Sequence, residues 1–253
     1  MTNAQITLVQ LDNYGPWTVT PEPRREADLQ TMQSRLFADL SQFFGTRDGY
    51  VFFTRFDNMI AVTNGADLED HARVQESIRN RYPVTVSLGI GTGASPTDAL
   101  VDATAHLQAA GSAQDAERRE VLGGQPLADD ERADDDVHIA HFDVNDATGK
   151  YTDELDAFST FVRIEQGYAS LMRVLHDEYG GLGFFVGGDN VVAIVPELDR
   201  AAYEAVIEHV RAEADMSLKV GVGSGHTATD AGLAAKHALE RCREDGTIVE
   251  GDV

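Results

Sequence analysis

The chain repeats itself, and this repeat limits its fold more than any other feature of the sequence. Apolar runs surround an Asp-Asn pair at residues 57–58, and the same arrangement returns at residues 189–190, at an offset of 132 residues. Two glycine-rich segments, 89–93 and 221–225, have the same offset. Similarity at one fixed spacing indicates a duplicated unit. We therefore predict two domains of similar fold.

A linker is predicted between the two repeats, at residues 123–136. This stretch contains a Gly-Gly pair, Pro126 and a run of acidic residues, a composition typical of connecting segments. The division gives a first domain of residues 1–122 and a second domain of residues 137–253. Each is roughly 120 residues long, close to the commonest domain size, so each can bury its own core.

Both repeats show one order of predicted elements: a strand, a long helix, a hairpin of two strands, a helix, a strand and a last helix. Apolar residues three or four positions apart mark one face of each long helix. These residues are Leu29, Met32, Leu36, Phe37, Leu40, Phe43 and Phe44 in the first repeat, and Leu155, Phe158, Phe161, Ile164, Tyr168, Leu171 and Leu175 in the second. The order is ferredoxin-like. It predicts an α+β fold of two tandem domains, each an antiparallel sheet with helices on one face.

The composition is strongly acidic. The chain has 43 acidic and 20 basic residues, and its formal net charge is −23. Such a surface lacks the basic patches that hold a nucleic-acid backbone or an anionic membrane, so neither is an expected partner. Acidic surfaces suit concentrated salt, because screening removes their self-repulsion, and we expect a protein of a salt-adapted cytoplasm. An ordinary acidic cytosolic protein is the alternative.

The cysteine content and the N-terminal sequence exclude further classes of protein. Cys242 is the single cysteine, so neither an intrachain disulfide nor a thiolate cluster for zinc can form. The N-terminal sequence lacks the basic start and apolar core of a signal peptide, and no apolar run is long enough to span a bilayer. We therefore expect a cytoplasmic protein.

Aspartates stand at two positions that a ferredoxin-like sheet brings together. Asp12 and Asp143 end the first strand of each repeat at an offset of 131 residues, and Asp57 and Asp189 lie at the hairpin tips. The first strand neighbours the hairpin strands, so Asp12 with Asp57 and Asp143 with Asp189 are predicted metal-binding pairs. Carboxylate oxygens suit Mg²⁺. The alternative is that Asp and Asn are only good turn residues, but a strand-end aspartate in both repeats favours the metal.

Basic and amide side chains of the first repeat are candidates for binding phosphate groups. Arg24 and Arg25 precede the long helix, whose first amides attract anions. Arg55 lies two residues before Asp57 and so shares its side of a strand. One guanidinium group can donate two parallel hydrogen bonds to two oxygens of a phosphate group. An ion pair at the surface is the alternative for any one of them. The predicted phosphate-binding set is Arg24, Arg25, Arg55, Arg79, Asn80 and Arg81.

Two other patterns carry weaker signals. The glycine-rich segments do not have the spacing of a dinucleotide-binding loop, and we interpret them as strand exits where another backbone approaches closely. His138 and His141 lie three residues apart on a strand, so they face opposite sides and are poor joint metal ligands.

Long segments of the sequence resemble archaeal GTP cyclohydrolase III. The segments are LDNYGPWTVTP at 11–21, PRRE at 23–26, TRFDN at 54–58, QESIRNRYP at 75–83, GSAQD at 111–115 and GGDN at 187–190. The likeness spans essentially the whole chain. That family has tandem domains similar to the palm of nucleotide cyclases and diguanylate cyclases, whose Gly-Gly-Asp/Glu-Glu-Phe turn is echoed by the last segment. Asn190 replaces the second acid of the cyclases, and the first repeat lacks the Gly-Gly pair.

The resemblance implies hydrolysis of GTP with Mg²⁺ to 2-amino-5-formylamino-6-(5-phosphoribosylamino)pyrimidin-4(3H)-one and two phosphates, with a monovalent cation such as K⁺ as activator. Water must attack C8 of the guanine and must also cleave the phosphoanhydrides. We place the nucleotide in the first domain, because its loops carry the arginines and asparagines. The residues assigned to catalysis are Asp12, Asn13, Asp57 and Asn58. The second domain completes this site or pairs with another subunit, and a homo-oligomer, a dimer or tetramer, is expected.

Two other functions remain open. A nucleotide or diguanylate cyclase would release pyrophosphate and a cyclic product. A tandem that only binds GTP would leave the nucleotide unchanged, although the presence of Asp12 and Asp57 argues against it. Chromatography of the products of GTP, with a count of the phosphates released, distinguishes all three.

Overall fold

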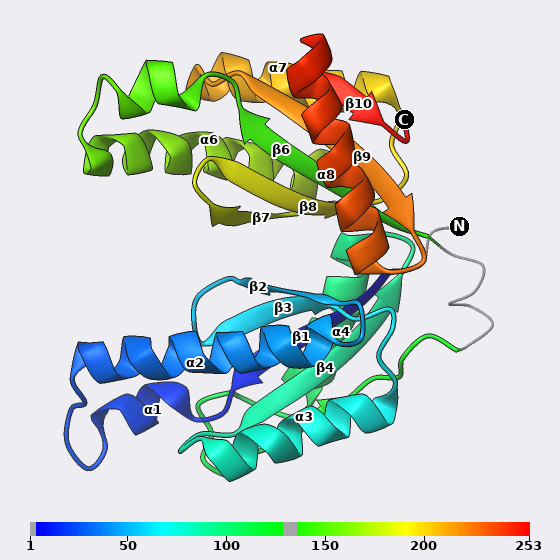
Figure 1. Cartoon of the computed structure of the whole chain (residues 1–253). Coiled ribbons are helices and arrows are strands. Elements are labelled where there is room, and N and C mark those ends of the chain that lie inside the picture. Colours follow the sequence, from blue (N-terminus) through cyan, green and yellow to red (C-terminus); the bar gives the residue numbers. More distant parts are fainter. Residues whose placement is uncertain (1–3, 129–135) are drawn as a thin grey trace.

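The structure is a computed structural model of the chain, and it describes residues 4–128 and 136–253. Two halves lie one above the other in Figure 1, each built on a five-stranded sheet. We call residues 4–123 the first half and residues 137–253 the second half. Most of the predicted linker, residues 129–135, lies outside the described residues. None of the described helices is long and apolar enough to cross a membrane.

The first half has the sheet order β2-β3-β1-β4-β5. Strand β1 is antiparallel to both of its neighbours, and β5 is parallel to β4. The elements are β1 (Ala4–Leu11), α1 (Tyr14–Val19), α2 (Glu26–Gly45), β2 (Tyr50–Phe53), β3 (Asn58–Val62), α3 (Leu68–Arg81), β4 (Val86–Gly93), α4 (Pro96–Ala109) and β5 (Leu122–Gly123).

The second half repeats this arrangement with the sheet order β10-β9-β6-β8-β7. Its elements are β6 (Val137–Val144), the π-helical turn η1 (Thr148–Thr152), α6 (Ala157–Tyr179), β7 (Leu182–Gly187), β8 (Asn190–Val195), α7 (Arg200–Ala214), β9 (Leu218–Gly225), α8 (Ala228–Asp245) and β10 (Val249–Gly251). The predicted α+β class and the ferredoxin-like order are confirmed. Each sheet also carries a short parallel edge strand, β5 or β10, that the sequence did not indicate.

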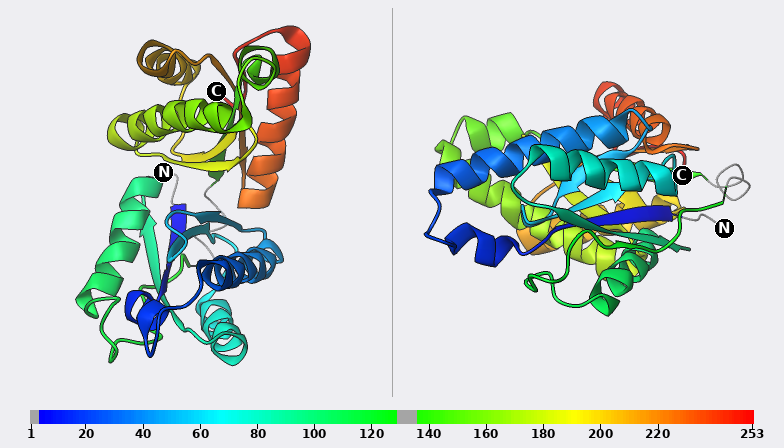
Figure 2. Two further views of the ribbon diagram at one scale, coloured as in Figure 1. Left: turned by 90° about the vertical axis from the view of Figure 1, so that its left-hand side faces the viewer. Right: turned by 90° about the horizontal axis from the view of Figure 1, so that it is seen from below.

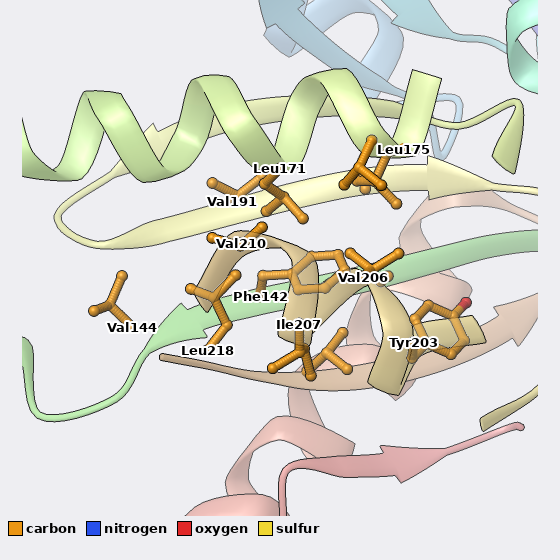
Figure 3. Packing of buried hydrophobic residues seen from close by; sticks show 14 of the residues in the cluster. Phe142, Val144, Leu171, Leu175, Val191, Tyr203, Val206, Ile207, Val210 and Leu218 are labelled. Carbon is orange, nitrogen blue, oxygen red and sulfur yellow. The ribbon is translucent and has the colours of Figure 1, made fainter. Parts of the chain in front are cut away.

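One face of each sheet is covered by the two helices of the ferredoxin-like order. In the first half, Leu36, Leu40 and Phe44 of α2 pack with strand residues such as Val9 and Met59. Figure 3 shows the matching core of the second half, where side chains of α6 and α7 meet those of β6, β8 and β9. The alternation of inward residues along each strand therefore builds a core of its own in each half.

The helices α4 and α8 lie on the opposite face of the sheets, so helices are not confined to one face as expected. Glycines of the adjacent strands make this possible. A Cβ at Gly91 would meet the backbone of Ala99 in α4, and one at Gly223 would meet the backbone of Ala235 in α8. The glycine-rich segments are therefore sites of close backbone approach, as interpreted from the sequence.

The remainder of this second face joins the two halves. Ile6, Phe52 and Ile60 of the first half belong to one buried cluster with Ile139 and Phe184 of the second. The rings of Phe52 and Phe184 stack with their centroids 4.4 Å apart. The two sheets thus face each other across a shared core. The left view of Figure 2 shows the two halves stacked.

The apolar face predicted for the long helix of the second half is only partly buried. Ile164, Leu171 and Leu175 are in the core, but Phe158 is 71% exposed and Phe161 is 50% exposed. The 23 residues of α6 span roughly 34 Å, whereas the six residues of β7 span about 20 Å. The first turns of α6 therefore extend beyond the sheet.

Candidate functional site in the second half

The strand register corrects the alignment of the two repeats at their first strand. In the first half Gln10 is paired with Asn58, and in the second half Asp143 is paired with Asn190. Asn190 is the repeat counterpart of Asn58. The counterpart of Asp143 is therefore Gln10, at an offset of 133 residues, and the match with Asp12 predicted from the sequence is wrong.

The counterpart of Asp12 is Asn145. The Asp12 backbone N–H donates to the Thr85 carbonyl at 3.0 Å, and the Asn145 N–H donates to the Ser217 carbonyl at 2.8 Å. The next residue has a positive φ in both halves, 51° and 54°. The error arose because an aspartate follows an apolar residue in both repeats, at positions that differ by two.

The carboxylate pair predicted in the second half is brought together. Asp143 is 4% exposed and lies on β6, beside the β7–β8 hairpin that carries Asp189. Burial, and next to it the negative charge of Asp143, raise the pKa of Asp189. Two carboxylates that repel each other in this way are a fitting pair of ligands for a divalent cation.

Two basic side chains meet the same carboxylate. Lys219 Nζ lies 3.0 Å from Asp143 Oδ2, and Arg243 Nη2 lies 3.1 Å from the same oxygen. Lys219 comes from β9 and Arg243 from the last turns of α8. Two basic side chains therefore lie beside one buried carboxylate.

His141 and Asn190 complete the cluster. His141 is two residues before Asp143 on β6, so both side chains share one face of the strand. The Asn190 amide donates to Asp189 Oδ1 at 3.0 Å, and its oxygen lies 3.1 Å from His141 Nε2. Burial lowers the pKa of His141, which favours the neutral imidazole. Nε2 then donates to Asn190, and Nδ1 is left as the proton acceptor.

This face of the second half borders a cavity of about 750 Å³ between the two halves. The second half contributes His141, Phe185 and Lys236 to its lining, and the first half contributes Phe37, Ser41 and Tyr50. A largely apolar cavity with a few polar groups is typical of a small-molecule site.

The carboxylate pair predicted in the first half has a different environment. Asp12 is 4% exposed, and its carboxylate accepts three hydrogen bonds, from Thr85 Oγ1, Ser87 Oγ and the Glu120 backbone N–H, at 2.8, 2.6 and 2.9 Å. The loop after α4 covers it. Both oxygens of the Asp12 carboxylate are thus engaged by neutral donors of the protein.

Asp57 does lie at the end of β1, as predicted. Its carbonyl accepts a hydrogen bond from the Leu11 N–H at 3.0 Å, and its carboxylate accepts one from Asn58 at 2.8 Å. Arg55 is 74% exposed, with its guanidinium 3.7 Å from Asp57. Asn13 follows the strand with its N–H donating to the Ala113 carbonyl at 2.7 Å.

The remaining members of the predicted phosphate-binding set do not converge on one place. Arg24 stacks on the Trp17 ring at 4.0 Å, and Arg25 pairs with Asp28 at the surface. The other three lie at the far end of α3. Arg79 pairs with Glu120 at 2.7 Å, Arg81 pairs with Asp39 at 3.0 Å, and Asn80 is exposed.

Sequence reasoning missed the basic residues and the histidine of the second-half cluster. Lys219 and Lys236 were recognisable by rarity, because the chain has three lysines in all. Arg243 carried no signal, since its place beside Asp143 depends on the packing of α8. The spacing of His141 from His138 gave no indication of its place beside Asn190.

The donor set can be tested against the expected metal. Within residues 4–128 and 136–253, no three His, Cys, Asp or Glu side chains converge in a way that could hold a metal ion. A carboxylate pair is nevertheless what Mg²⁺ requires, because it takes one or two protein carboxylates and completes its shell with water and substrate phosphates. Asp143 and Asp189 therefore fit Mg²⁺.

Paired ferredoxin-like domains, with a cavity between them whose wall includes His141 of the carboxylate cluster, define a tandem α+β protein with a site suited to a small molecule. Residues 6–253 match the family model described as GTP cyclohydrolase III, and the chain belongs to that family.

Curated proteins with the name of this family are similar to nearly the full chain. It is 71% identical to GTP cyclohydrolase III 1 of Halobacterium salinarum, over 99% of this chain and 98% of that protein. GTP cyclohydrolase III of Natronomonas pharaonis is 65% identical, over 99% of both chains. The enzyme of the same name from Methanocaldococcus jannaschii is 47% identical, over 98% of this chain and 91% of its own.

Solved structures show a weaker likeness. The match to a class III adenylyl cyclase-like ATP-binding protein from Pseudomonas aeruginosa spans 88% of this chain and 75% of that protein. The identity is 11% and the TM-score is 0.37. The match to the GGDEF domain of DgcB from Caulobacter crescentus spans 46% of this chain and 77% of that chain. The identity is 15% and the TM-score is 0.39. Likeness at this level carries no conclusion about function.

Proposed function

We propose that the chain hydrolyses GTP to 2-amino-5-formylamino-6-(5-phosphoribosylamino)pyrimidin-4(3H)-one and two phosphates, in the cavity between its halves. Membership of the GTP cyclohydrolase III family makes the chain a GTP cyclohydrolase. The observation that carries the location is the cluster of Asp143 and Asp189 with Lys219 and Arg243, next to His141, which lines the cavity.

The site therefore moves from the first half, where the sequence placed it, to the second. The first half has Gln10 at the position of Asp143, and its Asp12 is covered by a loop. The arginines of the predicted phosphate-binding set lie apart from one another, each with its own partner. The first half instead supplies a wall of the cavity, with Phe37, Ser41 and Tyr50.

Asp143 and Asp189 would hold Mg²⁺, which supplies charge neutralisation at the phosphates and activation of water when bound. Lys219 and Arg243 are placed to exchange part of their contact with Asp143 for contact with phosphate oxygens, and the planar guanidinium can bind two oxygens at once. His141 is placed to accept a proton at Nδ1 from the water that attacks C8, because burial keeps its imidazole neutral.

Three further expectations are part of the proposal. A monovalent cation such as K⁺ activates the enzyme, the protein is a homo-oligomer, a dimer or tetramer, and it works in a salt-rich cytoplasm. The acidic surface supports the last of these. The aromatic groups left exposed on α6, Phe158 and Phe161, are compatible with contacts between subunits.

A matched pair of variants tests the location. We expect Asp189→Asn to lower turnover on the order of 100-fold or more, because an amide cannot replace the charge of a metal ligand. Asp57→Asn changes the same residue type at the same hairpin position of the first half, and it should keep most of the activity. Loss of activity in Asp57→Asn alone would return the site to the first half.

Product analysis tests the reaction itself. GTP incubated in high salt with Mg²⁺ should give the formylamino pyrimidine and two phosphates for each GTP consumed. Pyrophosphate with a cyclic nucleotide would show a cyclase instead. Unchanged GTP would show a protein that binds the nucleotide without turnover.

A further inference from the structure

The first half carries a positive group where the second half carries its carboxylate. Gln10 occupies the position of Asp143, and its amide donates to Asn58 Oδ1 at 3.0 Å. Arg118, from the loop after α4, donates through Nη1 to Gln10 Oε1 at 2.7 Å. At this strand position the second half therefore has a carboxylate, and the first half has a neutral amide bound to a cation.

Arg118 is buried without a full set of partners. The residue is 5% exposed, and among the described residues neither Nε nor Nη2 has a hydrogen-bond partner. Burial lowers its pKa, and the charge of Asp12 opposes this shift only in part. A buried cation with unpaired N–H groups is costly. Nε and Nη2 lie on one edge of the guanidinium, the edge that binds two oxygens of one anion.

A second cleft between the halves borders the β2–β3 hairpin, whose strand β3 begins with Asn58. It has a volume of about 450 Å³ and lies between Thr54 and Ile60 of the first half and residues of α6 and β7, such as Met172 and Phe184. It is the repeat counterpart of the catalytic cavity, because that cavity is lined by the matching elements α2 and β2. Thr54 Oγ1 donates to the Asn58 carbonyl at 2.9 Å, which links the wall of the cleft to the Gln10 and Arg118 pair.

We propose that Arg118, Gln10 and Asn58 form a second, metal-independent site for a phosphate group. Gln10 is partly exposed and accepts only from Nη1, so the Nε–Nη2 edge has no partner among the described residues and is the edge offered to an anion. The phosphate comes either from inorganic phosphate, a product of the proposed reaction, or from a nucleotide. The proposal rests on the proposed function only in taking the second half as the catalytic one.

Binding in the presence of EDTA tests this site, because EDTA removes Mg²⁺-dependent binding. Two probes are used on the full chain in high salt: radiolabelled inorganic phosphate, and GTP with an imido bridge between its outer phosphates. We expect one EDTA-resistant ligand per chain for at least one probe, which also identifies the source. Arg118→Met should weaken this binding at least about tenfold, and Arg118→Lys should weaken it less. Asp189→Asn should keep it and lose the Mg²⁺-dependent binding.

Melting curves show which variants are folded. Should Arg118→Met fail to fold, Asn58→Asp keeps the guanidinium and places a negative charge beside it, so phosphate binding should fall in that variant as well. Absence of EDTA-resistant binding in the unchanged protein overturns the proposal, as does equal binding in a folded Arg118→Met protein. Arg118 would then be only an internal counter-charge for Asp12. Failure of the proposed function would appear separately, in the product analysis.

Discussion

At the scale of residues, the surroundings of a carboxylate decide what it can do. Asp12 and Asp143 are equally buried, but Asp12 meets three neutral donors and Asp143 meets two cations. The sequence predicted the pairing of Asp143 with Asp189, because neighbouring strands bring those positions together. It could not predict the covering of Asp12, since the donors come from segments more than seventy residues away whose packing is set by the whole fold.

A structural role for Asp12 leads to a first prediction. Asp12→Ala leaves two hydroxyl groups and the Glu120 N–H buried without their acceptor, so we expect a loss of about 2–3 kcal/mol in the free energy of unfolding. Binding of Mn²⁺, followed by electron paramagnetic resonance, should stay unchanged in the folded variant. A drop in the number of Mn²⁺ ions bound would show that Asp12 is a metal ligand after all.

A second prediction concerns Tyr82. Burial, and then its hydrogen bond to Asp39, raise the pKa of Tyr82 to about 12. The folded state therefore favours the neutral phenol. This contribution to stability is complete below about pH 10, the pKa of an unfolded tyrosine, and is lost as the pH rises through about 12. Tyr82→Phe should remove this part of the decline in unfolding free energy, measured with denaturant at several pH values. An equal decline in both proteins would contradict the assignment.

At the scale of elements, periodicity predicted the long strands and helices and missed the short ones. Strands β5 and β10 have two and three residues, too few for an alternating pattern to stand out. The position of α4 and α8 on the second face depends on small residues that allow close approach, and glycine alone does not say which element approaches. Phe158 and Phe161 fitted the helical spacing of α6, but spacing gives no information on where the sheet beneath a helix ends.

The close approach of α8 to β9 gives a third prediction. Gly223→Ala places a methyl group against the backbone of Ala231 and Ala235, which cannot move without shifting the helix, so we expect a loss of about 2–4 kcal/mol in stability. Gly45→Ala is the control, because nothing lies within 4 Å of a Cβ there. Thermal melting of both variants measures the difference, and equal melting temperatures would contradict the proposed contact.

At the scale of the whole molecule, a shared core and a large net charge act against each other. The stacked rings of Phe52 and Phe184 hold the halves together, while a charge of −23 favours expansion. The charge could be read from composition, and the duplication from the repeat. The face-to-face packing of the halves could not, because apolar residues on the second face of a sheet do not reveal what covers them.

The fourth prediction follows from this balance. Lowering KCl from molar concentrations to about 0.1 M, where the screening length is about 10 Å, should lower the melting temperature. Replacing KCl by an equal concentration of tetramethylammonium chloride preserves screening and removes K⁺. Stability should then be kept while activity falls, if K⁺ activates at a bound site. A melting temperature independent of salt would show that the surface charge does not oppose folding.

The two clefts between the halves have a meaning for the history of the chain. In a symmetric pair of identical subunits, every substitution is made twice, and both clefts change together. A single polypeptide that carries both copies is released from this constraint. Gln10 at the position of Asp143, and Arg118 beside Gln10, are differences that a pair of identical subunits cannot carry. Joining the copies thus left each cleft free to take on its own set of side chains.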